Sequence, residues 1–185
     1  MTIATSALPL IAGAWKLDAH HSDVSFTVRH LGISKVRGHF NSFDASLAVG
    51  DSLETSSLNA TADLSSVDTN NADRDGHLQS TDFFNTETHP QMTFSSSSIV
   101  DNGDGEYTVA GTLTINGTAK PVELAVEFNG AEIFPMDQSV HAGFSASATI
   151  SRSAYGIDFN VPLGVDKVMI GDKVAIELEV QFVQP

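Results

Sequence analysis

The chain has 185 residues, of which 41% are hydrophobic and 17% charged, and its lack of cysteine excludes disulfides and thiolate metal sites. This length and balance predict a single globular domain. A formal net charge of -14, with nine Lys and Arg against 23 Asp and Glu, argues against a nucleic-acid partner, because phosphate binding needs clustered positive charge.

The N-terminal residues 1–14 are predicted to form a flexible arm ahead of a domain that spans residues 15–185. An apolar patch lies within the arm, but a secretory signal needs a basic first segment and a longer apolar run. Lys16 is the first basic residue, and Pro9 interrupts the patch. We therefore expect a cytoplasmic protein without a transmembrane segment, since no apolar run reaches the roughly 18 residues of a membrane helix.

Alternating apolar and polar residues run through most of the chain, which is the period-two pattern of half-buried β-strands. The clearest examples, in chain order, are residues 22–30, 43–49, 58–64, 92–99, 107–115, 122–128, 140–150 and 174–182. Glycine-rich turn sequences separate some of them, and Asn116-Gly117 is the strongest short signal for a hairpin. Clean alternation in consecutive strands predicts antiparallel pairing, and this many strands predict a barrel or a sandwich.

One stretch, residues 70–84, breaks the alternation. Asn70 or Asn71 can cap a helix there, and Leu78 lies on a face with residues three or four positions away. We therefore expect one short helical region in an otherwise all-β protein. At about 3.3 Å per residue, the segment 139–151 would span roughly 43 Å, which predicts an elongated barrel.

Small side chains occupy the presumed inward face of several strands. Ala142, Ala146 and Ala148 share one such face, and Ala60 and Ala62 share another. An eight-stranded barrel is near the size at which the interior either packs solid or holds one ligand, and small inward residues favour the ligand. The alternative is that these alanines pack closely under the helix or in a dimer contact.

Several motifs follow one another in a specific order. They are Trp15-Lys16-Leu17-Asp18, Val36-Arg37-Gly38-His39-Phe40, Arg74-Asp75-Gly76-His77-Leu78, Asp82-Phe83-Phe84, Gly111-Thr112-Leu113-Thr114-Ile115 and a late group of Arg152, Tyr155-Gly156 and Asp158-Phe159. Together they resemble the YceI-like polyisoprenoid-binding family from about residue 15 to residue 182.

The resemblance implies an eight-stranded antiparallel lipocalin-like β-barrel that often forms a homodimer. It also implies an amphiphilic isoprenoid ligand, such as an isoprenoid quinone or a polyprenyl phosphate, with no cofactor and no established catalytic residue. Gln79 stands where a basic residue is common in the family, and Ala45 where a glycine is common. The loss of positive charge near the helix favours a neutral, quinone-type headgroup.

Candidate ligand-binding residues fall into two sets. The predicted pocket lining comprises Phe26, Val28, Phe40, Phe43, Leu78, Phe83, Phe84, Phe94, Ala142, Phe144, Ala146 and Ala148. The predicted headgroup contacts are Arg37, Arg74, His77 and Arg152, because Arg suits bidentate phosphate binding. Core packing of the aromatic residues and surface pairing of each arginine with an acidic residue are the alternatives.

Other chemistry has weaker support in the sequence. His20 and His21 are adjacent, so on a strand they would point to opposite faces, and we predict no metal site. The leading interpretation is a non-enzymatic carrier or reservoir that holds a long isoprenoid lipid in the barrel. Two alternatives are an enzyme on an apolar isoprenoid-type substrate, with His30, His77 or Asp82 as acid or base, and a dimeric stress-related protein without a lipid.

Overall fold

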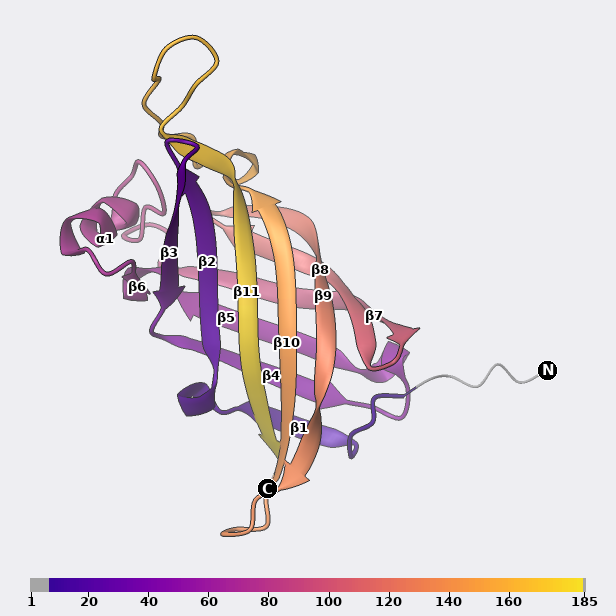
Figure 1. The fold of residues 1–185 in the computed structure, drawn as a ribbon. Helices are drawn as coiled ribbons and strands as arrows, with labels where there is room; N and C mark the ends of the chain where they lie inside the picture. Colours follow the sequence, from indigo (N-terminus) through magenta and orange to yellow (C-terminus); the bar gives the residue numbers. More distant parts are fainter. Residues whose placement is uncertain (1–6, 185) are drawn as a thin grey trace.

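The computed structural model describes residues 7–184, which form a closed antiparallel β-barrel (Figure 1). The strands are β1 (Gly13–Leu17), β2 (Asp23–His30), β3 (Ser34–Phe40), β4 (Phe43–Val49), β5 (Ser57–Asp63), β6 (Val67–Asp68), β7 (Gln91–Gly103), β8 (Glu106–Ile115), β9 (Thr118–Ile133), β10 (Val140–Ser151) and β11 (Ile170–Gln184). The helices are α1 (Ala72–Gln79) and the short 3-10 turns η1 (Ala19–His21), η2 (Leu53–Thr55), η3 (Leu64–Ser66) and η4 (Arg152–Tyr155).

The strands follow the order β1-β4-β5-β7-β8-β9-β10-β11-β2-β3-β6, and pairing of β1 with β11 closes the sheet. Three of the barrel's strands are interrupted. The segments β1 and β2 both pair with β11, so they act as two halves of one strand. In the same way, β4 pairs with β1 and β3 pairs with β2. Beyond them, β5 pairs with β4 and β6 pairs with β3. Counting β1 with β2, β3 with β4, and β5 with β6 as one strand each gives the eight-stranded antiparallel barrel that the sequence predicted.

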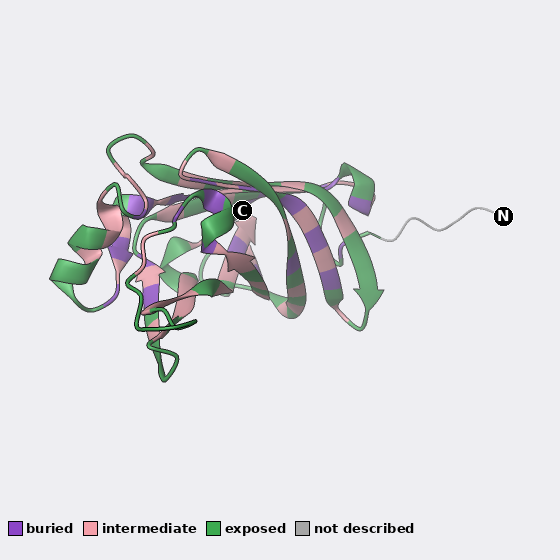
Figure 2. Ribbon diagram, turned by 90° about the horizontal axis from the view of Figure 1, so that it is seen from above, coloured by how far each residue is buried: buried purple, intermediate pink, exposed green. Residues whose placement is uncertain are grey.

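Alternation in the sequence becomes alternation in burial, as the banded strands of Figure 2 show. In β8, Tyr107, Val109, Leu113 and Ile115 are buried, while the residues between them are mostly more exposed. The predicted hairpin between β8 and β9 is confirmed, because Asn116 and Gly117 both adopt positive φ, as a two-residue type I′ turn requires.

The barrel is elongated, because β9 has 16 residues and β11 has 15, so each spans roughly 50 Å at about 3.3 Å per residue. We call the end with the β2–β3 turn and the loop before β11 the upper end, and the end with the β9–β10 loop the lower end (Figure 1).

Helix α1 lies outside the barrel beside β6, near the upper end (Figure 1). It begins after Asn71, whose side chain accepts a hydrogen bond of 3.0 Å from the backbone N–H of Arg74, as predicted for a cap. Within the predicted 70–84 region, α-helix occupies only Ala72–Gln79, and hydrogen-bonded turns follow it. None of the helices in residues 7–184 has the length and apolar character needed to cross a membrane.

The described part of the predicted N-terminal arm packs on the barrel. Leu8 is buried in a cluster of core residues that also contains Trp15 and Phe182, which we call the lower core cluster. The indole N–H of Trp15 donates a hydrogen bond of 3.0 Å to the backbone oxygen of Ile11. Strand β1 already begins at Gly13, because pairing with β4 extends two residues beyond the predicted domain boundary. Residues 1–6 of the arm lie outside the described residues.

Candidate functional site

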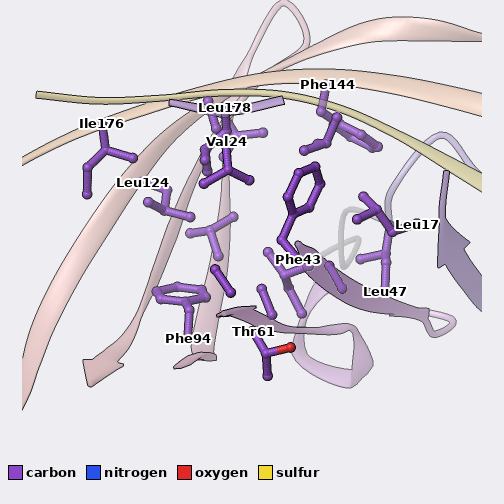
Figure 3. Close-up of a pocket in the computed structure, with 18 of the residues that line it drawn as sticks. Leu17, Val24, Phe43, Leu47, Thr61, Phe94, Leu124, Phe144, Ile176 and Leu178 are labelled. Atoms are coloured by element: carbon purple, nitrogen blue, oxygen red, sulfur yellow. The ribbon is translucent and has the colours of Figure 1, made fainter. Parts of the chain in front are cut away.

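An apolar cavity of about 180 Å³ lies inside the middle and lower part of the barrel (Figure 3). Its walls come from the inward faces of strands around the whole barrel, and the labelled side chains converge on one space from opposite sides. Almost all of the lining is aliphatic or aromatic, so this lower cavity can bury hydrocarbon but offers few groups that could recognise a polar ligand.

The structure places four predicted pocket residues, Phe43, Phe94, Phe144 and Ala146, in the wall of the lower cavity. Two predicted alanines lie elsewhere. Ala142 is fully buried in the lower core cluster and lines neither interior cavity. Ala148 borders a groove that also contains the exposed Glu123, because β10 pairs with β9 only as far as Ser147 and the two strands separate beyond it.

A second cavity of about 350 Å³ lies at the upper end, between the barrel and α1. The structure brings six predicted pocket residues to this upper cavity, namely Phe26, Val28, Phe40, Leu78, Phe83 and Phe84. Val24, Met92 and Ile176 line both cavities, so the two spaces adjoin along the barrel axis. The upper cavity alone is near the small end of the range of about 300–1,000 Å³ that is common for drug-sized ligands, so a longer ligand would need both cavities.

Arg152 lines the upper cavity, but its hydrogen bonds go to the protein backbone. Its Nε donates to the carbonyl of Gly171, its Nη1 to those of Ile157 and Phe159, and its Nη2 to that of Ile170, at 2.8–3.3 Å. The side chain is buried, and this burial lowers the pKa of the guanidinium. Arg152 therefore fixes the loop between β10 and β11, a structural role that differs from the predicted headgroup contact.

Arg74 and Arg37, the other predicted headgroup arginines, occupy different positions. Arg74 lines the upper cavity and donates from Nε to the hydroxyl of Thr69 at 2.7 Å and from Nη2 to its carbonyl at 2.8 Å. Those bonds use two of its five N–H groups, so donors remain for a ligand. Arg37 is exposed and lines neither cavity, because its neighbour Val36 points inward and alternation turns Arg37 outward.

His77, the last predicted headgroup contact, lies at the rim of the upper cavity. Its Nε2 is 2.8 Å from Oδ2 of Asp82, and its ring packs edge-on against Phe83 and Phe159. The structure therefore joins two of the predicted acid–base candidates, His77 and Asp82, in one half-exposed pair. The third candidate, His30, lines the same cavity from β2.

Tyr155 is a lining residue that the sequence prediction of the site missed. The side chain is 2% exposed, and its hydroxyl has no hydrogen-bond partner among the described residues. Burial raises the pKa of this phenol, which therefore keeps its proton at neutral pH. A buried hydroxyl without a partner is costly, and this one belongs to a residue that lines the upper cavity.

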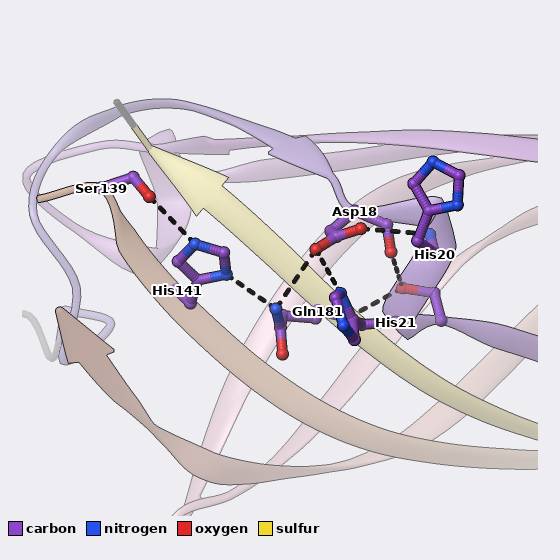
Figure 4. Close-up of polar contacts among 7 residues, drawn as sticks. Asp18, His20, His21, Ser139, His141 and Gln181 are labelled. Carbon is purple, nitrogen blue, oxygen red and sulfur yellow. Dashed lines mark hydrogen bonds and ion pairs between the residues drawn. The ribbon is translucent and has the colours of Figure 1, made fainter. Parts of the chain in front are cut away.

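A polar network ties the strands together at the lower end (Figure 4). Nε2 of His141 lies 2.9 Å from the hydroxyl of Ser139, and its Nδ1 lies 2.7 Å from the side-chain amide of Gln181. That amide is 3.4 Å from Oδ2 of Asp18, which also contacts His21 at 2.7 Å. The network joins η1, β10 and β11, and within it His21 is hydrogen-bonded to Asp18.

The closed antiparallel barrel, with its elongated apolar interior and polar groups near one end, defines a lipocalin-like β-barrel protein. The chain belongs to the YceI-like domain family, whose sequence model matches residues 15–182. This confirms the family resemblance of the ordered motifs.

Relatives and solved structures agree with this assignment. A UPF0312 protein of Staphylococcus epidermidis is 43% identical over 170 residues, which cover 91% of this chain and 96% of the relative. The crystal structure of BcnA from Burkholderia cenocepacia matches with a TM-score of 0.77 at 26% identity, covering 89% of this chain and 98% of that one.

Two further structures extend the comparison. The YceI protein of Campylobacter jejuni matches with a TM-score of 0.72 at 30% identity, covering 91% of this chain and 96% of that one. A polyisoprenoid binding domain from Saccharophagus degradans matches with a TM-score of 0.67, covering 92% of this chain and 98% of that one. Its identity of 16% supports likeness of fold alone.

Proposed function

We propose that this protein binds an isoprenoid lipid, with the tail in the lower cavity and the headgroup in the upper cavity. The observation that carries the proposal is that the two cavities adjoin. Together they form an apolar interior that has polar side chains only toward its upper end. Each buried methylene contributes up to about 0.8 kcal/mol, so the tail would supply most of the affinity. The polyisoprenoid binding domain of Saccharophagus degradans is consistent with such a ligand.

The lining of the upper cavity favours a neutral headgroup with hydrogen-bond acceptors, such as an isoprenoid quinone. Tyr155 offers a neutral donor, and Arg74 offers unused N–H groups. The charge of Arg152 is already surrounded by backbone carbonyls. A phosphate would meet Arg29 and Arg74 in this cavity, but within a protein whose net charge of -14 disfavours an anion.

Native mass spectrometry of the purified protein, followed by denaturing extraction, tests the proposal. We expect a bound mass that is released as an intact isoprenoid lipid, and a supplied isoprenoid quinone recovered unchanged after incubation. Recovery of a converted product would support the enzyme alternative, with the pair of His77 and Asp82 as its first candidates. A protein that neither carries nor takes up any isoprenoid would contradict lipid binding altogether.

Competition between a quinone and a polyprenyl phosphate of matched tail length tests the headgroup. We expect Arg74→Gln to weaken binding of both ligands and Arg37→Gln, on the outer face, to change neither. Phosphate that outcompetes quinone at moderate salt would contradict the neutral headgroup. The homodimer and the cytoplasmic location remain predictions, for which sedimentation velocity and cell fractionation are the measurements.

A further inference from the structure

Two exposed apolar turns stand at the upper end of the barrel, beside the upper cavity (Figure 1). One is the β2–β3 turn, residues 31–33, where Ile33 is 80% exposed. The other is the loop 161–168, where Val165 is 90% exposed. We call these two segments the apolar tips, and their exposed side chains are Leu31, Ile33, Val161, Leu163, Val165 and Val168.

Backbone hydrogen bonds order both tips. The loop folds back on itself, since Leu163 N–H donates to the carbonyl of Lys167 and Met169 N–H to that of Val161, each at 2.9 Å. A hydrogen bond of 2.8 Å from Leu31 N–H to the carbonyl of Met169 joins the β2–β3 turn to the residue that follows the loop. The ordered backbone thus holds these apolar side chains in solvent. Their exposure does not contribute to folding, so it needs another explanation.

The β2–β3 turn also carries a conformational cost. Leu31 has φ +54° and Gly32 has φ +71°, as in a type I′ turn. Asn, Asp and Gly suit such positions, whereas a bulky apolar residue with positive φ is an outlier. Leu31 therefore combines backbone strain with exposure, a combination that is typical of a functional site.

Positive charge gathers around the tips, although the protein as a whole is acidic. Segments 29–37 and 161–173 contain five of the nine Lys and Arg and only two of the 23 acidic residues. The five are Arg29, Lys35, Arg37, Lys167 and Lys173, all exposed. The loop at the opposite end differs, because it exposes Ile133 and Met136 beside Glu132 and Asp137 and has no Lys or Arg from 130 to 141.

We propose that the apolar tips dock this protein on an anionic lipid bilayer, so that the upper cavity opens toward the membrane. Apolar side chains flanked by basic residues match the boundary between acyl chains and anionic headgroups. The acidic remainder of the surface would be repelled, which would orient the barrel with its upper end down. His30 and Met169 line the upper cavity and directly adjoin the tips, so a lipid could pass from the bilayer into the barrel. This last role rests on the proposed lipid binding, whereas docking itself does not.

Flotation of the purified full-length protein with vesicles tests the docking. The probes are vesicles of phosphatidylcholine alone and of phosphatidylcholine mixed with phosphatidylglycerol. The test variant combines Ile33→Asp with Val165→Asp, and the matched control combines Ile133→Asp with Met136→Asp in the lower loop. We expect the native protein and the control to float with the anionic vesicles, and the test variant to float at least about tenfold less. Added salt should weaken flotation of the native protein.

Three results would overturn the proposal: no flotation of the native protein, equal loss in the two variants, or flotation that is the same with both vesicle types. Sedimentation velocity adds a fourth, because dissociation of an oligomer by the test variant would assign the tips to contact between two copies. Binding of farnesol from solution separates this proposal from lipid binding itself. Failure of the native protein to take up farnesol or any longer isoprenoid would contradict the proposed function, while flotation would still report on docking.

Discussion

The two cavities of the barrel differ in the chemistry of their walls. The lower cavity is lined almost entirely by hydrocarbon, whereas Arg74, His77, Arg152 and Tyr155 interrupt the apolar wall of the upper one. Polar residues of the upper cavity divide further into a group satisfied by backbone, Arg152, and groups with donors to spare, Tyr155 and Arg74. A polar side chain beside a cavity is thus a ligand contact only if its own hydrogen bonds leave donors unused.

Removing the satisfied arginine should have the largest effect. Arg152→Met removes a donor from four backbone carbonyls, of which only that of Ile170 keeps another side-chain donor, Asn160, so the free energy of unfolding should fall by about 3–5 kcal/mol. Urea denaturation measures the loss, and Arg37→Met on the exposed outer face should change stability by less than about 0.5 kcal/mol. Unchanged stability with abolished lipid binding would instead place Arg152 against the ligand.

Filling the lower cavity should affect the tail without affecting headgroup choice. Ala146→Trp adds bulk inside the cavity, so we expect weaker binding of long isoprenoids and an overpacking cost of about 1–3 kcal/mol or less. Ala148→Trp is the matched control, because Ala148 lines neither interior cavity. Thermal melting and lipid titration should be measured together. Equal binding by the two variants would show that the tail lies elsewhere.

Removing the unpartnered hydroxyl should affect the headgroup alone. We expect Tyr155→Phe to weaken an isoprenoid quinone by about 1 kcal/mol, or about fivefold, the size of one hydrogen bond. Affinity for squalene, which has no hydrogen-bond acceptor, should not change. The stability of the protein should not fall either, because the substitution removes a buried hydroxyl that has no hydrogen-bond partner. A fluorescent-lipid displacement assay compares the two ligands. An equal loss of affinity for both would mean that Tyr155 shapes the cavity only.

The smallest expected effect is a pH dependence near the upper cavity. Hydrogen bonds from Ser151 and Ser153 hold the pKa of Asp172 below its ordinary value. Because the folded-state pKa is lowered, the carboxylate stabilises the fold above its unfolded-state pKa, and this contribution is lost as pH falls through the folded-state value. The stability difference between the native protein and Asp172→Asn should therefore shrink below about pH 4, from less than about 1 kcal/mol at neutral pH. A constant difference across a urea titration series from pH 3 to about pH 7 would contradict this.

Much of the cavity lining could be predicted from the sequence, because inward-facing residues follow the strand alternation. Phe26, Phe43 and Phe144 all point inward as predicted. The two alanines that lie elsewhere show the limit of this reasoning, since Ala142 and Ala148 share the inward parity of Ala146. Close packing surrounds the first, and the strands separate at the second. Neither effect has a local sequence signal.

The sequence by itself determined the all-β architecture, the hairpin at Asn116-Gly117, a helix cap at Asn70 or Asn71, and the family. These features depend on side-chain periodicity and on the conformations of single residues, which are local properties of the chain. Only the tertiary structure decided which polar groups meet the cavity with unused donors. The partners of Arg152 come from both ends of a long loop, and the burial of Tyr155 depends on how the turn after β10 folds against the barrel. Hydrogen-bond satisfaction is a property of contacts between distant segments, so it appears only once those segments are packed together.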